Sequence, residues 1–444
     1  MNQTYMKDER IFPLIIKMSL PMVVSMWVNS MYNIVDSFFV AKISENAMTA
    51  LSLVYPLQNL INAVMIGFGI GVNASIAYFL GAGDERQAHK SAGQGMVLAT
   101  IHGVIFMIAC IIGIRPFLQL FTSDAETISY GVRYSNIAFM FSVIIAWQLI
   151  FEKTFQAVGR MMATMICMMA GFITNIVLDP VLIFGMGIFP EMGIDGAALA
   201  TGLGQAVTLL FYLWFYKFKP INIRFKREFF RLDKRTCFRL YSVGIPASLN
   251  IALPSVLISA LNVILAGFSQ SYVFVLGIYY KLQTFLYLPA NGVVQGIRPI
   301  IGYNYGAKEL DRVKKIFYTA MAIVAVIMVI GTILCILLPD ILMGMFTQNS
   351  DTVLKGVNAL RILCAGFVVS AVSVTATGAL EGLGKGTLSL IISLLRYALL
   401  IIPIAYVLSI LIGVTGVWHA FWITESITSV IAYIIFVRML KYRL

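Results

Sequence analysis

Asp36 is the residue most able to do chemistry, because it lies within an apolar stretch that runs from about residue 11 to residue 41. A carboxylate at membrane depth costs free energy and is normally kept for a function. Asn29 and Asn33 precede it at helical spacing, which puts the three polar side chains on one face of a helix. We therefore take Asp36 as the first member of a candidate cation site.

Three further polar residues are expected at the depth of Asp36. Asn175 and Asp179 are four residues apart, and Thr201 lies near the start of the next apolar stretch. With a rise of about 1.5 Å per residue, all four fall at a similar level in the outer half of the protein. Their oxygens can coordinate Na⁺, and neighbouring carboxylates can instead share a proton. The sequence thus predicts a site for H⁺ or Na⁺, with structural hydrogen bonds at a helix crossing as the alternative.

The composition requires a membrane around the elements that position these residues. The chain has 444 residues, 60% of them hydrophobic and 12% charged, and its mean hydropathy is +0.89. A soluble domain does not carry so much apolar surface with so few charges. Apolar runs of about 18 residues or more, each able to span a bilayer as a helix, recur about twelve times. They lie near residues 12–40, 50–80, 92–115, 130–157, 162–187, 195–217, 237–267, 273–303, 313–338, 354–381, 386–411 and 416–437.

The chain consists of two copies of one unit. Pro21 corresponds to Pro246 at a spacing of 225 residues (246 minus 21). The same spacing pairs Gly81-Ala82 with Gly306-Ala307, Phe121-Thr122 with Phe346-Thr347, and Gly159-Arg160 with Gly384-Lys385. Asp36 then falls opposite Leu261, so one copy carries a charge that the other lacks.

The other members of the candidate site are also apolar in the second copy. Local alignment of Pro180 with Pro403 and of Gly196 with Gly416 gives the register. It places Asn175 opposite Ala398, Asp179 opposite Ile402 and Thr201 opposite Phe421. The candidate site therefore belongs to the first copy alone.

Six spans in each copy place both copies in the same orientation, which implies a pseudo-two-fold axis along the membrane normal. The expected fold class is an all-α integral membrane protein of 12 transmembrane helices, in two pseudo-symmetric six-helix lobes around a central cleft. The predicted parts are an N-terminal lobe of residues 1–219, a basic cytoplasmic linker of residues 220–236 and a C-terminal lobe of residues 237–444.

Lysines and arginines beside the spans indicate the orientation. If Met1 is cytoplasmic, the inside connections hold most of the 32 Lys and Arg, including the stretch from Lys217 to Arg239. Both termini are therefore expected in the cytoplasm. The net charge of +12 is then a topology signal that faces anionic lipids, not a nucleic-acid footprint.

Other charges and amides inside the spans have less certain roles. Lys281 lies deep enough to face a cavity, and Asn33, Lys281 and Arg298 are possible contacts for a substrate in the cleft. Lys153, Glu381 and Arg298 lie near cytoplasmic ends, where we expect them to extend to the lipid headgroups. The sequence leaves open the roles of Lys281, Arg298, Arg396, Glu381 and Glu152.

Several motifs resemble those of a transporter family. They are Tyr32-Asn33-Ile34-Val35-Asp36, Asn175-Ile-Val-Leu-Asp179-Pro180, Gly193-Ile-Asp-Gly196-Ala-Ala-Leu-Ala-Thr201 and Gly302-Tyr-Asn-Tyr-Gly306-Ala-Lys308. Over nearly its whole length the chain resembles the multidrug and toxic compound extrusion (MATE) family, in its bacterial MepA/DinF-like type. The resemblance implies a V-shaped cleft between the lobes and a cation site in the N-terminal lobe. Some relatives have further acidic residues in spans seven and ten, where this chain has Pro254 and Ser370, so no second cation site is expected.

The expected function is that of a secondary active multidrug efflux antiporter in the bacterial inner (cytoplasmic) membrane. It would export amphipathic, mostly cationic compounds in exchange for H⁺ or Na⁺ by alternating access. The expected partners are small-molecule drugs or organic cations, the coupling ion and membrane lipids. We expect a monomer without cofactor, catalytic residues, nucleic-acid partner or any metal beyond a possible Na⁺. The alternative is a lipid-linked sugar or lipid flippase of the same superfamily, which would show a cationic cleft.

Overall fold

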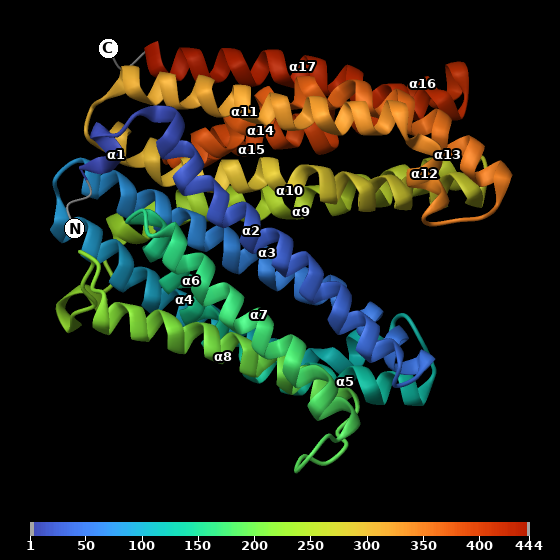
Figure 1. The fold of residues 1–444 in the computed structure, drawn as a ribbon, viewed down its shortest axis with the longest axis horizontal. Helices are drawn as coiled ribbons and strands as arrows, with labels where there is room; N and C mark the ends of the chain where they lie inside the picture. Colours follow the sequence, from blue (N-terminus) through green and yellow to red (C-terminus); the bar gives the residue numbers. More distant parts are fainter. Residues whose placement is uncertain (1–3, 442–444) are drawn as a thin grey trace. The chain divides into compact units, whose positions relative to one another are not determined.

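The structure is a computed structural model that describes residues 4–441, so residues 1–3 and 442–444 of the two predicted lobes lie outside it. Helices make up nearly all of the described chain (Figure 1). The first half contains α1 (Tyr5–Asp8), α2 (Ile11–Ala41), α3 (Glu45–Gly81), α4 (Glu85–Gln119), α5 (Ala125–Met140), α6 (Ser142–Ala157), α7 (Met161–Phe184) and α8 (Ile194–Phe218).

The second half repeats this series of long helices after the short helix η1 (Arg227–Phe230). It contains α9 (Lys234–Ala266), α10 (Gln270–Gly306), α11 (Leu310–Leu337), α12 (Pro339–Gly344), α13 (Ser350–Leu363), η2 (Cys364–Gly366), α14 (Phe367–Gly382), α15 (Gly386–Leu394), η3 (Leu395–Leu399), α16 (Ile401–Ile412) and α17 (Val414–Lys441).

The helices coincide with the spans predicted from apolar runs. Among the described residues, 10 helices are long and apolar enough to cross a membrane, or 11 if the bent pair α5 and α6 counts as one span. The remaining long helix is α10, whose 37 residues include Lys281 and Arg298. With α10 included, each predicted span overlaps one helix or one interrupted helix, because an apolar run of this length has no other way to satisfy its backbone hydrogen bonds.

The fourth predicted span is bent. Its halves α5 and α6 meet at Phe141 with an angle of 48°. Phe141 lies against Gly202 of α8, where an added Cβ would come within 2.3 Å of the Phe141 ring. A glycine at position 202 therefore lets the α8 backbone pass the aromatic ring at the bend.

The described residues form two compact units, one of residues 24–248 and one of residues 4–23 with 249–441. Within the first unit, α7 and α8 approach closely at Gly171 and Gly204. A Cβ on Gly171 would lie 2.6 Å from the Gly204 carbonyl oxygen and 1.9 Å from Thr208 Oγ1. Small residues permit such backbone contact between membrane helices, and this helix pair carries most of the candidate site.

Residues of the predicted linker lie within the first unit and bond to α4. Gln94 Nε2 donates to the Arg231 carbonyl oxygen at 2.8 Å, and Gln94 Oε1 accepts from the Asp233 N–H at 3.1 Å. Asp233 also pairs with Lys90 at 3.1 Å. The division of the chain at residues 219 and 237 stays a prediction.

Candidate cation-coupling site

The four predicted site residues lie on three helices, and all four belong to the first unit. Asp36 lies on α2, Asn175 and Asp179 on α7, and Thr201 on α8. Asp36 is 8% exposed, Asn175 2% and Asp179 0%, and Thr201 is partly buried. These polar groups are therefore largely removed from solvent.

Asn175 connects the two closely packed helices. Its Nδ2 donates to Asp179 Oδ1 at 3.3 Å and to Thr201 Oγ1 at 3.3 Å. A Cβ on Gly204 would lie 3.2 Å from Asn175 Cβ, so the glycine leaves room for the amide between α7 and α8. Asp36 and Asp179 lie close enough for their charges to interact. Asp36, Asn175, Asp179 and Thr201 thus form one cluster, the acidic cluster.

Three buried oxygens of this cluster have no hydrogen-bond partner among the described residues. They are Asp36 Oδ1, Asn175 Oδ1 and Asp179 Oδ2. An unsatisfied buried acceptor costs about 1–3 kcal/mol, and more when it is charged. A proton on a carboxylate or a small cation between the oxygens would remove this cost. The described residues contain no group of three or more His, Cys, Asp or Glu that could hold a metal ion.

Two tyrosines that sequence analysis missed lie beside the carboxylates. Tyr32 on α2 and Tyr134 on α5 are each close enough to interact with the charges of Asp36 and Asp179. Gln58 Nε2 donates to the Tyr134 hydroxyl oxygen at 3.4 Å. Tyr32 is four residues before Asp36, so helical spacing could have revealed it. No spacing in the sequence connects Tyr134 with the site.

The predicted polar face of α2 does not converge on the cluster. Asn29 and Asn33 are exposed, whereas Asp36 is buried. Asn33 Nδ2 donates to the Asn29 carbonyl oxygen at 2.7 Å, so its amide bonds to its own helix. Lys281 is also exposed, and its Nζ lies 5.9 Å from the centroid of the Phe346 ring. A substrate contact at Asn33 or Lys281 stays a prediction.

The expected extension of charges to the headgroups is wrong. Lys153 Nζ lies 2.6 Å from Glu152 Oε1, and these side chains are 6% and 9% exposed. An Arg298 Nη atom lies 2.7 Å from Glu381 Oε2, with 18% and 3% exposed. The position of a residue along a predicted span does not show whether a partner lies beside it. A buried partner that neutralises the charge makes extension to the headgroups unnecessary.

The partners of Glu381 come from several helices of the second unit. Asn250 Nδ2 on α9 donates to Glu381 Oε1 at 3.0 Å and to Ser389 Oγ at 2.8 Å. Ser389 Oγ also lies 3.3 Å from Glu381 Oε1. With Arg298, these residues form a polar quartet. The positions 225 residues earlier are also polar, and they hold Ser25, Asn73, Gln156 and Thr164.

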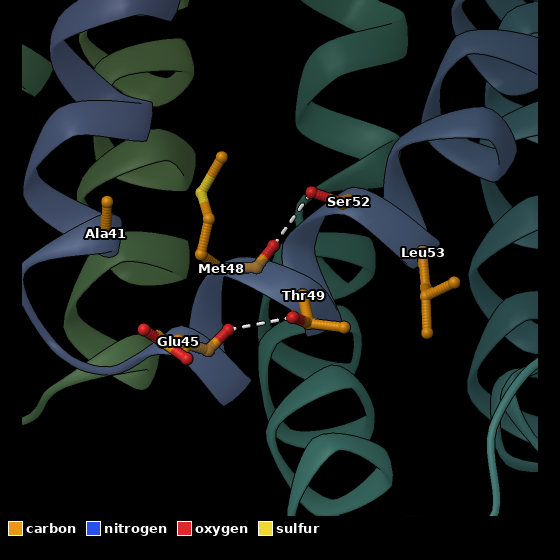
Figure 2. A pocket seen from close by; sticks show the side chains of 6 residues that line it. All are labelled: Ala41, Glu45, Met48, Thr49, Ser52 and Leu53. Atoms are coloured by element: carbon orange, nitrogen blue, oxygen red, sulfur yellow. Dashed lines mark hydrogen bonds between the residues drawn. The ribbon is translucent and has the colours of Figure 1, made fainter. Parts of the chain in front are cut away.

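A separate surface hollow of about 470 Å³ lies at the start of α3 (Figure 2). Its lining residues are Ala41, Glu45, Met48, Thr49, Ser52 and Leu53. Thr49 Oγ1 donates to the Glu45 carbonyl oxygen at 2.8 Å, and Ser52 Oγ to the Met48 carbonyl oxygen at 2.9 Å. Because both hydroxyls bond to their own helix, the hollow offers a ligand little besides the Glu45 carboxylate. None of its lining residues belongs to the acidic cluster.

Long apolar helices and an internal duplication indicate a multi-pass membrane protein, and the buried ionisable cluster is its candidate site. The MatE family model matches residues 21–181 and 246–407, and the chain belongs to that family. The two matches begin at Pro21 and Pro246, the prolines that define the repeat.

Relatives match the chain over nearly its full length. The multidrug export protein MepA of Staphylococcus saprophyticus is 26% identical over 441 residues, which are 99% of this chain and 96% of the relative. MepA of Staphylococcus aureus strain MSSA476 gives the same values. A crystal structure of MATE in complex with MaL6 has a TM-score of 0.92 at 22% identity and covers 100% of this chain and 99% of its own. The predicted family and all-α fold class are confirmed.

Proposed function

We propose that this protein is a secondary active multidrug efflux antiporter. It exports amphipathic, mostly cationic compounds in exchange for H⁺ or Na⁺. Membership of the MatE family and the names of the MepA relatives support export of small molecules. The observation that carries the coupling is the pair of buried carboxylates, Asp36 and Asp179, whose Oδ1 and Oδ2 atoms respectively have no partner among the described residues.

The chemistry of the pair makes cations and cationic substrates compete. With both carboxylates ionised, a poorly solvated site carries negative charge, and any cation that approaches lowers its free energy. Asn175 holds Asp179 through one hydrogen bond and Thr201 through another, so it positions the oxygens that a Na⁺ ion would contact. A proton on either carboxylate would satisfy the same need.

Alternating access supplies the coupling. A cation drives export only if it binds the outward-facing and inward-facing states with different affinity. Entry of H⁺ or Na⁺ at Asp36 and Asp179 reduces the negative charge, and α2, α7 and α8 repack around the filled site. The substrate then loses affinity and leaves on the outer side.

We further propose a monomer in the bacterial inner membrane, with both termini in the cytoplasm. The excess of Lys and Arg in alternate connections supports this orientation. A flippase for lipid-linked sugars would need a cleft with net positive charge. Arg298 and Arg396 each pair with a glutamate, Glu381 and Glu425 respectively, so neither pair has a net charge. The acidic cluster therefore favours the antiporter.

Binding of a permanently cationic fluorescent dye to the purified protein tests this function. Since the dye cannot change its own charge, its affinity should fall as the pH is lowered from about 8 to about 5, or as Na⁺ is added, because either cation neutralises the carboxylates. Dye export from proteoliposomes, with pH and Na⁺ gradients imposed separately, then identifies the coupling ion. Affinity that neither ion changes would contradict the proposal, and preference for an anionic lipid-linked sugar would favour the flippase.

A further inference from the structure

The second unit contains a buried ion pair that the proposed cation site does not use. Arg396 lies on η3 and Glu425 on α17, with Arg396 Nε 2.6 Å from Glu425 Oε1. The two side chains are only 9% and 14% exposed. Ser373 Oγ on α14 donates to Glu425 Oε2 at 3.3 Å. The pair therefore lies where three helical elements of the unit meet.

The arginine has hydrogen-bonding capacity left over. Its Nε donates to Glu425, and no hydrogen bond joins its two Nη atoms to the described residues. A guanidinium presents its donors as a planar fork that matches two oxygens of one anion. The buried Tyr280 hydroxyl also has no partner among the described residues, and it lies close enough to interact with the charges of Arg396 and Glu425.

The backbone that carries Arg396 departs from an α-helix. Leu395–Leu399 is a π-helical segment, in which the Leu400 N–H bonds to the Leu395 carbonyl oxygen at 3.1 Å. Such single-turn bulges are rare and concentrate at functional sites, because they change the direction of one side chain within a helix. Arg396 is the charged residue of this bulge.

We propose that Arg396, together with the Tyr280 hydroxyl, forms an anion subsite in the second unit. It takes the carboxylate, sulfonate or phosphate group of an amphipathic zwitterion or anion. This subsite widens the substrate class of the proposed antiporter beyond simple cations. Export of the bound anion rests on the proposed function. Binding itself requires only the second unit's own residues.

Charge balance predicts that anion binding is linked to a proton. The Arg396–Glu425 pair is neutral, so an arriving anion adds one negative charge to a poorly solvated place. Glu425 can restore neutrality by taking up a proton from water, whereas the guanidinium stays charged. The groups that face Glu425 are Arg396 from η3, Tyr279, Tyr280 and Tyr287 from α10, Ser373 from α14 and Gly366 from η2, and Tyr397 of η3 lies against Arg396. Glu425 is the one carboxylate among these groups, so it is the group that would accept the proton.

The test uses the full-length protein in phosphatidylcholine nanodiscs and two fluorescent probes, N-dansyl-phenylalanine and its carboxamide. The probes share one apolar body and differ only in the carboxylate. At about pH 5.5 the carboxylate should bind at least about tenfold more tightly than the carboxamide. Its affinity should fall by up to about tenfold per pH unit as the pH rises, as a one-proton linkage requires. Equal affinity for the two probes would overturn the proposal.

Two variants separate the roles of the pair. Glu425→Gln leaves the guanidinium in place, so it should keep the carboxylate preference and lose the pH dependence. The double variant Arg396→Gln/Glu425→Gln preserves the net charge and should bind both probes equally. A double variant that keeps the preference would show that the pair only holds α17 against η3. The control Glu152→Gln/Lys153→Met neutralises a buried ion pair of the first unit and should keep the preference.

Thermal unfolding and gel filtration show whether each variant is folded, and the neutral double variant keeps the proposal testable if Glu425→Gln is unstable. Nanodiscs with added phosphatidylglycerol distinguish the sources of the anion. A phosphate headgroup that occupies the subsite should compete with the carboxylate probe in the wild type but not in the double variant. If the lipid lowers probe binding equally in both proteins, it does not occupy the subsite, and the subsite takes soluble anions.

Two outcomes separate this proposal from the proposed function. Export of a cationic dye without any carboxylate preference would refute the subsite alone. A carboxylate preference without export would refute the proposed function alone.

Discussion

The two copies of the repeat have similar helices but distribute their buried charges differently. The first copy holds Asp36 and Asp179, where the second has Leu261 and Ile402. The second copy holds Arg396 and Glu425. The register that aligns Pro180 with Pro403 places Ile173 opposite Arg396, and the register of the last span places Gln205 opposite Glu425.

A second set of polar positions is shared. Asn250, Arg298, Glu381 and Ser389 correspond, at a constant spacing of 225, to Ser25, Asn73, Gln156 and Thr164. In the first unit, Lys153 joins two of the latter, because Asn73 Nδ2 donates to the Lys153 carbonyl oxygen at 3.0 Å and Lys153 Nζ lies 3.3 Å from Gln156 Oε1. In the second unit, the quartet bonds directly.

The comparison teaches how to separate scaffold from function inside a membrane. A polar group that both copies keep is explained most simply by helix packing, which both copies need. A charge opposite an apolar residue of the other copy, such as Asp36, Asp179 or Arg396, has no such explanation, and its desolvation cost calls for a function. The acidic cluster and the Arg396–Glu425 pair are therefore the functional candidates, and the polar quartet is the scaffold.

The largest expected effect comes from removing the charge that distinguishes the first copy. Asp36→Asn should reduce gradient-driven export to the level of empty proteoliposomes, while the protein stays folded. Removing an unpaired buried charge removes a desolvation cost, so unfolding is not expected. Dye export and thermal unfolding measure the two effects. The control is Ser259→Ala in the second copy, whose exposed hydroxyl donates to the Ser255 carbonyl oxygen. Full export by folded Asp36→Asn protein would reject the proposed coupling site.

A smaller effect is expected when the carboxylates remain but lose their positioning amide. Asn175→Ala removes the contacts of 3.3 Å to Asp179 and Thr201. Loss of a hydrogen bond to a charged group costs about 1.5–3 kcal/mol. Because the amide positions the oxygens, the cation affinity should fall by roughly ten- to a hundredfold. Cation competition with the dye measures this affinity. Thr174→Ala is the matched control, because Thr174 Oγ1 donates to the Ala170 carbonyl oxygen of its own helix. Unchanged competition in Asn175→Ala would show that the amide is structural only.

Sequence patterns predicted the helices well, since length and apolarity alone identify a membrane span. The first span was placed at residues 12–40 and is Ile11–Ala41. The bend at Phe141 was not predicted, because neither proline nor glycine interrupts the chain there and the contact that accompanies it comes from Gly202 on another helix.

In the candidate site too, the sequence reveals residues that share a helix but not contacts between helices. Asn175 and Asp179 could be found because they are four residues apart on one helix. Tyr134 could not, since its place beside Asp36 depends on how α5 packs against the other helices. The ion pairs of Lys153 and Arg298 were missed in the same way, because depth along a span does not reveal a partner.

The second copy should tolerate changes at the positions where relatives have acidic residues. Ser370→Ala removes bonds of 2.8 Å with the Tyr287 hydroxyl and 2.7 Å with the Phe367 carbonyl oxygen. We expect a loss of about 0.5–1.5 kcal/mol in unfolding free energy, with the effect of H⁺ or Na⁺ on dye binding unchanged. Pro254→Ala should likewise keep this effect. Loss of cation dependence with dye binding retained would move the ion site to the second copy.

The smallest effect concerns the linker, whose described contacts connect it to the first unit. The Lys90 ammonium and the Thr236 hydroxyl and N–H hold the pKa of Asp233 below its ordinary value. A lowered pKa in the folded protein means that the stabilisation is fully present above the ordinary carboxyl pKa and is lost as the pH falls through the lowered one. Asp233→Asn should therefore have a slightly lower Tm than the wild type from pH 8 to pH 5, and the difference should disappear in stronger acid. Lys90→Gln should reproduce only part of it, because the contacts with Thr236 remain. A Tm difference that is independent of pH would show that the Asp233 charge does not anchor the linker.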